Sequence, residues 1–286
     1  MNRWYFLLLT GVLCISTSAI LITLAAAPPT VAAFYRNFFA ALIWLVPFFK
    51  TRPFSPALFQ RNNKKYSPVF LFALLGLLFA ADLWAWHRCI IALGAGPATL
   101  LGNIQVLIVA LLALFFFGEK LKKHYWPGCF LALTGIAMLT LTKGIGQSVV
   151  IGLLLGLFTA LTYSFFLIIL KLLNDYRTTP RQILFWVAFF TTIFLLVPLF
   201  LEGKSLALAT PSLLWLLLHA FVSSVAGWWL IIKAMDHLPV SIASALLLLQ
   251  PILTSIWGEI FLGQSLNLVQ ISGILLAVGG IRLAVR

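Results

Sequence analysis

The chain has 286 residues, of which 63% are hydrophobic and only 9% are charged. Soluble domains carry about 25% charged residues, so this composition excludes a soluble globular fold for most of the chain. Lysine and arginine outnumber aspartate and glutamate by 19 to 6, which gives a formal net charge of +13. Nucleic-acid binding would explain such a charge, but the distribution of the basic residues argues against it.

Apolar runs follow one another with short interruptions. About 20 apolar residues cross a hydrocarbon core of about 30 Å. Long uniform runs satisfy their backbone hydrogen bonds in lipid as helices, whereas barrel strands alternate in polarity. The sequence therefore predicts an all-α integral membrane protein with ten transmembrane helices. We place these spans at 4–24, 30–49, 68–91, 96–117, 124–142, 149–173, 180–201, 211–235, 238–262 and 266–284.

The basic residues fall mainly on one side of the predicted spans. With both termini inside, the inner loops and ends hold 15 of the 19, and the exceptions are Arg36, Arg88, Lys143 and Lys204. This is the positive-inside pattern. It predicts a multi-pass protein of the cytoplasmic (inner) membrane with cytoplasmic N- and C-termini. The basic loop at 50–67 serves this topology, and contact with anionic headgroups is an additional interpretation.

The N-terminus resembles a signal peptide, because Arg3 precedes an apolar run that ends in three alanines. We expect no cleavage, since this first span has a counterpart at 149–173. The three cysteines, Cys14, Cys89 and Cys129, lie in apolar spans and are interpreted as small buried side chains. No Cys/His spacing indicates a metal, and no cofactor is predicted.

The chain aligns with itself without a gap when it is shifted by 145 positions. The matched pairs include Gly11 with Gly156, Arg36 with Arg181, Trp84 with Trp229, and Gln105 with Gln250. Each half holds five predicted spans, and an odd number makes the second half enter the bilayer from the opposite side. Such inverted repeats are typical of transporters, whose substrate site lies between the halves near the midplane. We predict a first five-helix repeat at 1–145 and a second, inverted one at 146–286.

Glycines mark where two of these helices approach a neighbour. Gly128 and Gly135 in the fifth span, and Gly273 and Gly280 in the tenth, are seven residues apart on one face. Small residues let membrane helices pack closely, so we expect these two spans to pack on each other or on a second subunit. The third, fourth, eighth and ninth spans carry the polar and aromatic residues and are expected to line the transport path.

Short motifs at the ends of the fourth and ninth spans point to a family. They are Phe117-Gly118-Glu119-Lys120-Leu121, Gln250-Pro251 and Leu262-Gly263-Gln264-Ser265-Leu266. With Arg36 in the second span, they make the whole chain resemble the EamA-type transporters of the drug/metabolite transporter superfamily. In that family a Gly-Glu-x-Leu-like turn ends the fourth span of each half. Glu119 fits this pattern, whereas Gln264 departs from it, and Val106 stands where the first half often has proline.

The resemblance implies ten helices, an inverted repeat, alternating access and transport of a small organic solute. Members of the family handle amino acids, nucleoside-like metabolites, quaternary amines and drugs, and efflux is the commoner direction. The resemblance does not identify the solute.

Ionisable groups inside a bilayer are costly, so each one is a candidate functional residue. Asp82 lies near the middle of the third span, where burial disfavours its charged form. That property suits proton coupling as well as substrate binding, and a packing role is the alternative. Trp84, Trp86 and His87 follow on the same helix and suit a cavity that binds a ring or a cation. An aromatic belt at the interface is the alternative for these three.

Further candidates lie in the second half and in the fourth span. Trp228 and Trp229 are hypothesised to gate the cavity opposite Trp84 and Trp86. Uncharged polar groups would orient the solute or join helices. These are Asn103, Gln105, Gln250 and Tyr163.

Trp257 and Glu259 suit an ammonium-bearing solute, and the alternative for Glu259 is an ion pair with Arg88 or Arg36. We expect Arg36 to pair with a carboxylate or a helix end. His219 is interpreted as a packing residue, and Thr17 and Ser18 are expected to bond their own backbone.

Together these features predict a secondary transporter, not an enzyme. It would move a small amphipathic metabolite, amino-acid-like or an organic amine, across the membrane by alternating access. The predicted partners are this substrate and the lipid bilayer, without nucleic acid, and the protein is a monomer or a homodimer. The alternatives are a channel or structural subunit, and a lipid-modifying enzyme, for which the sequence offers no nucleophile with a base.

Overall fold

Helices make up nearly all of the structure, as the long apolar runs predict. The computed structural model describes residues 3–49, 59–61, 64–66, 68–93, 95–141, 149–175 and 178–286. Lys50, Arg52, Lys143, Arg177 and the linker at 144–148 lie outside these ranges. Within the described residues, nine helical segments are long and apolar enough to cross a membrane. The all-α membrane fold is confirmed to this extent.

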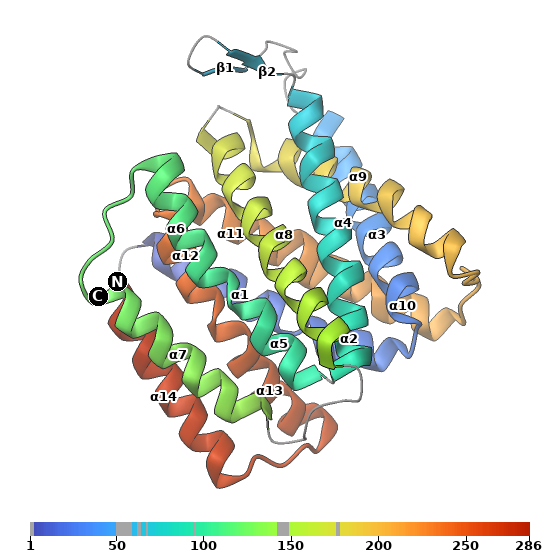
Figure 1. The fold of residues 1–286 in the computed structure, drawn as a ribbon. Helices are drawn as coiled ribbons and strands as arrows, with labels where there is room; N and C mark the ends of the chain where they lie inside the picture. The colour runs from blue at the N-terminus through green and yellow to red at the C-terminus, as the bar shows by residue number, and fades with distance from the viewer. Residues whose placement is uncertain are drawn as a thin grey trace.

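The helices follow the predicted spans in chain order (Figure 1). The first half contains α1 (Arg3–Ser16), α2 (Ser18–Ala25), α3 (Pro29–Phe49), α4 (Pro68–Leu93), α5 (Ala95–Asn103), α6 (Gln105–Phe117) and α7 (Tyr125–Thr140). The second half contains α8 (Val149–Asp175), α9 (Pro180–Leu201), α10 (Thr210–His219), the π-helix η2 (Ala220–Gly227), α11 (Trp228–Met235), α12 (Val240–Leu247), α13 (Leu249–Leu262) and α14 (Leu268–Val285).

Two features differ from the predicted spans. The fifth span, expected at 124–142, is the 16-residue helix α7, which is shorter than the other nine. The polar loop after α3 contains a small antiparallel hairpin of β1 (Phe59–Arg61) and β2 (Lys64–Tyr66), which the sequence analysis did not predict.

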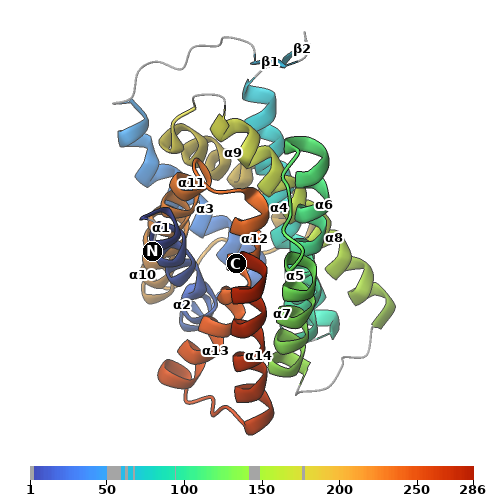
Figure 2. The same cartoon turned by 90° about the vertical axis from the view of Figure 1, so that its left-hand side faces the viewer.

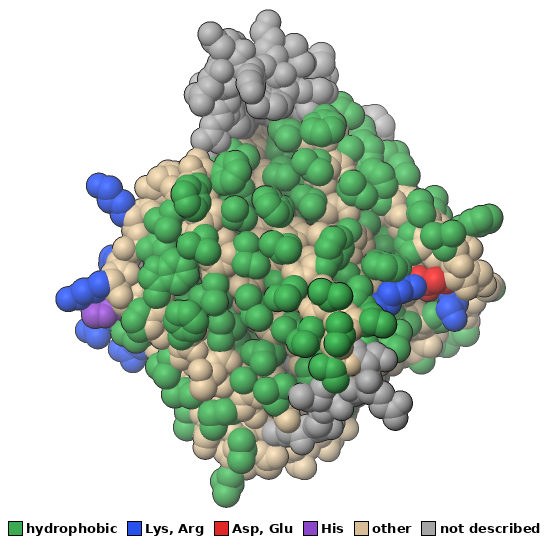
Figure 3. Space-filling model, in the orientation of Figure 1, with side chains coloured by type: hydrophobic (Ala, Val, Ile, Leu, Met, Phe, Trp, Pro, Cys, Tyr) green, Lys and Arg blue, Asp and Glu red, His purple; other side chains and the backbone are tan. Residues whose placement is uncertain are grey.

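The outer surface of the helices is suited to lipid. Large apolar side chains are strongly exposed, among them Phe200 at 87%, Phe115 at 84% and Ile91 at 77%. Figure 3 shows hydrophobic side chains across the face in view, with Lys and Arg gathered at the left edge and a smaller charged group at the right. Water would disfavour so much exposed apolar surface. The arrangement therefore fits a hydrocarbon layer between two charged ends.

Helices α7 and α14 pack against each other along their full length, side by side in Figures 1 and 2. A Cβ atom on Gly135 would lie 2.4 Å from the Ala277 nitrogen, and one on Gly280 would lie 2.3 Å from the Ala132 nitrogen. The backbones are thus in van der Waals contact because these positions lack side chains. The glycines were expected to pack these two helices either on each other or on a second subunit, and in the structure they pack on each other.

The two glycine turns close the fourth and ninth spans in the same way. Gly118 ends α6 and Gly263 ends α13, each with a left-handed φ near +60° that favours glycine. The next residue, Glu119, caps the start of α12. Its carboxylate accepts hydrogen bonds from the backbone N–H of Val240 at 2.7 Å and from the Ser241 N–H and hydroxyl. Glu119 therefore ties the first half to the second.

Other helix pairs repeat with the sequence offset. Helix α4 packs on α8, and its counterpart, formed by η2 and α11, packs on α1. The pair α3 with α9, like the pair α7 with α14, joins counterparts directly. These contacts thus have partner contacts in which the halves exchange roles. This exchange is expected when two similar bundles face each other across an approximate twofold axis.

The close approach of α7 and α14 predicts a selective effect of small substitutions. Gly135→Ala or Gly280→Ala forces the two backbones apart, and each should lower the free energy of unfolding by about 1–3 kcal/mol. The matched control is Gly279→Ala, because a Cβ there meets no atom within 4 Å. It should change stability by less than about 0.5 kcal/mol. Equal effects of G279A and G280A on thermal unfolding in detergent would contradict this packing account.

Candidate functional site

Buried polar side chains from three helices gather around Arg36 of α3. Arg36 and Asp82 of α4 are each only 8% exposed. Arg36 interacts electrostatically with Asp82 and with Tyr163 of α8, and Tyr163 in turn interacts with Asp82. The guanidinium carbon of Arg36 lies 5.3 Å from the centre of the Phe79 ring. The three polar groups therefore share one environment in the middle of the helices.

The two charges of this group have no direct protein partner. Within the described residues, neither Arg36 nor Asp82 makes a hydrogen bond, and no ion pair within 4.0 Å joins them. The sequence analysis expected Arg36 to pair directly with a carboxylate or a helix end, and neither pairing is present. Buried ionisable groups in membrane helices are usually paired or face a cavity. A proposed function therefore has to account for two buried charged side chains that are left unpaired.

Aromatic rings cover the group on one side. The ring of Phe166 lies 4.9 Å from Phe79 and 5.4 Å from Trp228, and Trp228 lies 6.3 Å from Tyr163, measured between centroids. A cavity of about 20 Å³ opens beside Phe79, Phe166 and Trp228 and is lined also by Asn37. Arg36, Asp82 and Tyr163 are not part of its lining. Such a volume holds about one water molecule. In this conformation the rings leave no room for an organic solute.

A second polar cluster lies where two helices are irregular. Helix α1 ends at Ser16 and α2 begins at Ser18, while α10 passes into the π-helix η2. The Ser18 hydroxyl is hydrogen-bonded to Nε2 of His219 and lies 3.0 Å from the hydroxyl of Ser223. His219 is fully buried, and its Nδ1 has no partner among the described residues. Ser18 thus departs from the predicted backbone bond.

Trp257 belongs to this second cluster. Its indole N–H donates to the Ser16 hydroxyl at 2.8 Å, and the Thr254 hydroxyl donates to the Ser16 carbonyl at 2.9 Å. The break in the first span therefore fixes the ring of Trp257 against α1. Thr17, at the break, donates to the Cys14 carbonyl at 2.7 Å, as expected for a hydroxyl that bonds its own backbone.

The counterpart of this cluster in the other half is apolar except at one position. By the 145-residue offset, Ser16, His219 and Ser223 correspond to Leu161, Leu74 and Leu78, whereas Ser18 corresponds to Tyr163. The equivalent helices α8 and α4 run without a break or a π-turn. Packing of this scaffold therefore needs neither the polar side chains nor the irregular helices. π-Turns are frequent at functional sites.

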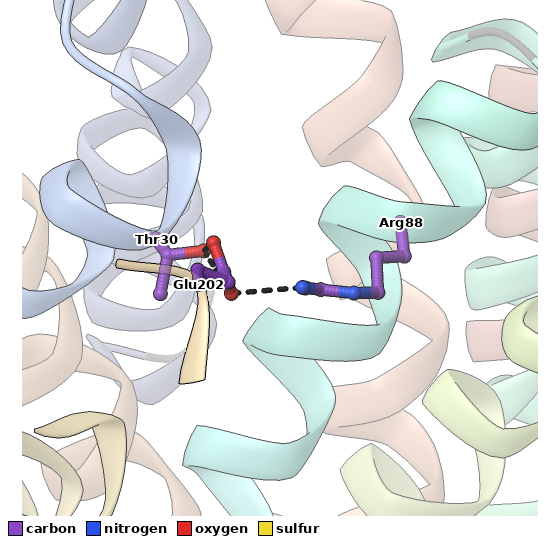
Figure 4. A network of polar contacts seen from close by, with 3 residues as sticks. All are labelled: Thr30, Arg88 and Glu202. Atoms are coloured by element: carbon purple, nitrogen blue, oxygen red, sulfur yellow. Dashed lines mark hydrogen bonds and ion pairs between the residues drawn. The ribbon is translucent and has the colours of Figure 1, made fainter. Parts of the chain in front are cut away.

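The distal part of the third span forms a separate network, shown in Figure 4. Nη2 of Arg88 lies 2.8 Å from Oε1 of Glu202, and the Thr30 hydroxyl donates to both carboxylate oxygens at 3.1 Å. The Arg88 guanidinium carbon lies 4.2 Å from the centre of the Trp84 ring. Arg88 thus pairs with Glu202, which the sequence analysis did not consider, and not with Glu259.

The remaining third-span candidates turn away from the Arg36 group or only approach it. Trp86 packs with Cys89, Leu93 and Ala98. His87 is buried, its Nδ1 has no partner among the described residues, and it interacts electrostatically with Arg36 and Arg88. Only Asp82 of the predicted third-span site lies at the centre.

The amide candidates flank two breaks between helices. Asn103 donates to the Thr99 carbonyl of its own helix at 2.7 Å. Gln105 is 2% exposed, and its Oε1 has no partner among the described residues. These two residues flank Ile104, between α5 and α6, while the half-buried Gln250 lies at the equivalent break between α12 and α13.

Two further candidates lie apart from the centre. The half-buried Trp229 is covered by the Lys233 ammonium, 4.4 Å from its ring centre. Glu259 is exposed and has no partner in the described part of the chain.

Sequence reasoning missed half of the central group. It placed Arg36 in a structural role and did not consider Asn37, Phe79 or Phe166. Phe79 lies one helical turn before Asp82, so its position on the same face was readable from the spacing. Of the second and sixth spans, which contribute α3 and α8, only Tyr163 of the sixth was a predicted site residue.

Comparison with solved structures supports the fold. One crystal structure superposes with a TM-score of 0.82 over 99% of this chain and 98% of that chain, at 17% sequence identity. At that identity the likeness concerns the fold alone.

Two curated relatives are similar in sequence. A protein of Salmonella typhimurium and one of Escherichia coli, each named a probable amino-acid metabolite efflux pump, are 26% identical to this chain over 238 residues. Each match covers 79% of this chain and 79% of the relative. The model of the EamA-like transporter family matches residues 2–141 and again residues 150–286. The chain is therefore a multi-pass membrane protein that belongs to the EamA-like transporter family.

Proposed function

We propose that the protein moves a zwitterionic, amino-acid-like metabolite across the cytoplasmic membrane, with efflux as the favoured direction. The observation that carries this proposal is the unpaired couple of Arg36 and Asp82, buried side by side with aromatic rings. A guanidinium binds a carboxylate through paired hydrogen bonds, and a buried carboxylate binds an ammonium group. A solute that carries both groups satisfies both residues at once. The names of the two curated relatives support the same class.

The aromatic side chains suit the remainder of such a solute. Phe79, Phe166 and Trp228 present faces and edges around the small cavity, and apolar or ring-bearing groups pack well on such surfaces. Because the cavity holds only about one water molecule, these rings have to move before a solute enters. We therefore assign the structure to a closed conformation, which fits a transporter better than an open pore.

Alternating access is the mechanism that the architecture supports best. The two bundles are similar, and each contains five predicted spans. Because an odd number of spans makes the second bundle enter the membrane from the opposite side, the two bundles form an inverted pair. We place the division between the two bundles at residues 145 and 146, and the separate matches of the family model to residues 2–141 and 150–286 support this placement. In the orientation set by the basic residues, α3 begins and both α4 and α9 end on the non-cytoplasmic side.

The network of Arg88, Glu202 and Thr30 then closes that side. It joins α4 and α3 of the first half to α9 of the second. Its counterpart on the cytoplasmic side is Lys233 over Trp229, which has no carboxylate partner within the described residues. The pair is partly exposed, at 30% for Arg88 and 18% for Glu202. Such a pair contributes about 1 kcal/mol or less, so it biases the closed state without preventing opening.

The zwitterion proposal predicts opposite defects in two variants. Arg36→Gln should weaken binding of an L-amino acid by about 10- to 100-fold, the loss expected for one charge-assisted hydrogen bond. It should leave the matching decarboxylated amine unaffected. Asp82→Asn should weaken the amino acid but not the matching deaminated acid. The measurement is ligand-induced thermal stabilisation of the purified protein with these three classes of compound.

The control for these variants is Glu259→Gln, which removes an exposed carboxylate outside the group. It should keep the response of the wild type to every compound. If amines bind the wild type as tightly as amino acids and R36Q binds both unchanged, the solute is not a zwitterion held by Arg36.

Proton coupling is proposed to run through Asp82. Its carboxylate is the one acidic side chain at the centre of the described helices, and proton uptake there removes the charge that holds an ammonium group. Asp82→Asn should therefore abolish the acceleration of transport by a pH gradient in proteoliposomes, whereas exchange of solute at equal pH should persist when the solute concentration is raised to offset the weaker binding. The same dependence on the pH gradient in D82N and wild type would exclude Asp82 as the proton carrier.

The closing network predicts a non-additive pair of variants. A cysteine at Asn37, which lines the cavity, should react faster with a membrane-impermeant maleimide from the non-cytoplasmic side in Arg88→Gln or Glu202→Gln. The increase should reach up to about fivefold, and the double variant should add nothing further. These variants carry no other cysteine, and Lys204→Gln, a nearby exposed cation, is the control. Unchanged labelling in both single variants would show that the pair does not hold this side closed.

A further inference from the structure

An open groove of about 430 Å³ runs along α14, away from the central cavity. Its floor contains Leu246 at the end of α12, 6% exposed, and Ile281 of α14, 4% exposed. Leu249 at the start of α13 and the exposed Val278 complete the aliphatic part. The groove therefore follows the break between α12 and α13, where the ninth span leaves space beside the tenth.

Two arginines stand at one end of this groove. Val278, Arg282 and Arg286 follow one another at intervals of four residues, and Ile281 lies three residues after Val278, so all four lie on one face of α14. Both arginines are exposed, and their side chains have no hydrogen bond or ion pair within the described residues. An aliphatic channel thus ends at two guanidinium groups that form no ion pair with a side chain in the described part of the chain.

A lysine strengthens the positive charge at this end. The Nζ atom of Lys122 donates a hydrogen bond to the Arg286 carbonyl at 2.6 Å, which brings a third cation to the end of α14. Figure 3 shows Lys, Arg and His side chains gathered at the edge where Figure 1 places both chain ends. The surface there is therefore basic where it meets the apolar belt.

The other half provides an internal comparison. The 145-residue offset places Leu101, Leu133 and Ile136 at the aliphatic positions, but Ala137 and Leu141 at the positions of the two arginines. Helix α7 packs on α14 through equivalent glycines in both halves. The scaffold therefore keeps its packing without cations at these positions, and the arginines need a separate explanation.

We propose that this groove binds an anionic phospholipid. The acyl chain lies along the leucine, isoleucine and valine side chains, and the phosphate meets Arg282 and Arg286. Guanidinium groups bind phosphate through paired, charge-assisted hydrogen bonds, and basic pockets between membrane helices at the cytoplasmic surface bind anionic headgroups. In the orientation proposed above, the groove opens to the cytoplasmic leaflet. The site depends only on the bilayer and not on the identity of the transported solute.

Native mass spectrometry of the protein exchanged into equal amounts of phosphatidylglycerol and phosphatidylcholine tests this site. The wild type should retain phosphatidylglycerol in preference. Arg282→Gln and Arg286→Gln should each reduce that preference by about fivefold, the value expected for one basic residue at an anionic lipid surface. Arg181→Gln, an exposed arginine outside the groove, should leave it unchanged.

Two further arms separate the headgroup from the chain. Val278→Trp fills the aliphatic part and should remove retained lipid while both arginines remain. An excess of inorganic phosphate should not displace the lipid, since a free phosphate lacks the chain. The proposal is wrong if the wild type retains both lipids equally or if the R282Q/R286Q double variant keeps the wild-type preference. It is also wrong if V278W still retains the lipid or if free phosphate displaces it.

Discussion

The structure depends on two opposite charges held in the middle of apolar helices without touching each other. Removing charged groups from water is costly, and Arg36 and Asp82 are both buried with no hydrogen bond in the described structure. Their mutual attraction offsets part of that cost, and the π-face of Phe79 offsets a further part for the guanidinium. A direct ion pair would stabilise the site more. No such pair occurs within the described residues.

The scaffold around this pair is nearly symmetric, and its departures from symmetry coincide with the polar groups. Contacts of α4 with α8 repeat as contacts of η2 and α11 with α1. Yet the polar cluster of Ser18, His219 and Ser223 occurs in only one of these two interfaces. Likewise, Arg282 and Arg286 of α14 have no basic counterparts in the other half, where Ala137 and Leu141 stand at the equivalent positions. Because an equivalent interface packs without them, the packing of the scaffold alone does not account for these side chains.

The connections between the halves differ in strength in a way that suits movement. Glu119 caps α12 through backbone N–H groups, and α7 and α14 are in backbone contact. These two contacts are extensive, and each holds an element of the first half against an element of the second. The Arg88–Glu202 contact is a single, partly exposed pair on the other side. The two halves are therefore joined more weakly at this ion pair than along α7 and α14.

The sequence by itself determined the membrane class, the approximate spans and the glycine faces of α7 and α14, because hydrophobic runs and glycine spacing act locally along one helix. It left open whether those faces meet each other or a second subunit. It also indicated Asp82, since a carboxylate in such a run is conspicuous. Only the tertiary structure decided the partners. Arg36 and Arg181 occupy the same repeat position, but Thr179 and Pro180 start α9 just before Arg181, which is exposed, whereas Arg36 lies two turns inside α3. Likewise, Arg88 meets Glu202 and Ser18 meets His219 across more than a hundred residues, and such contacts are set by helix packing, which no local pattern encodes.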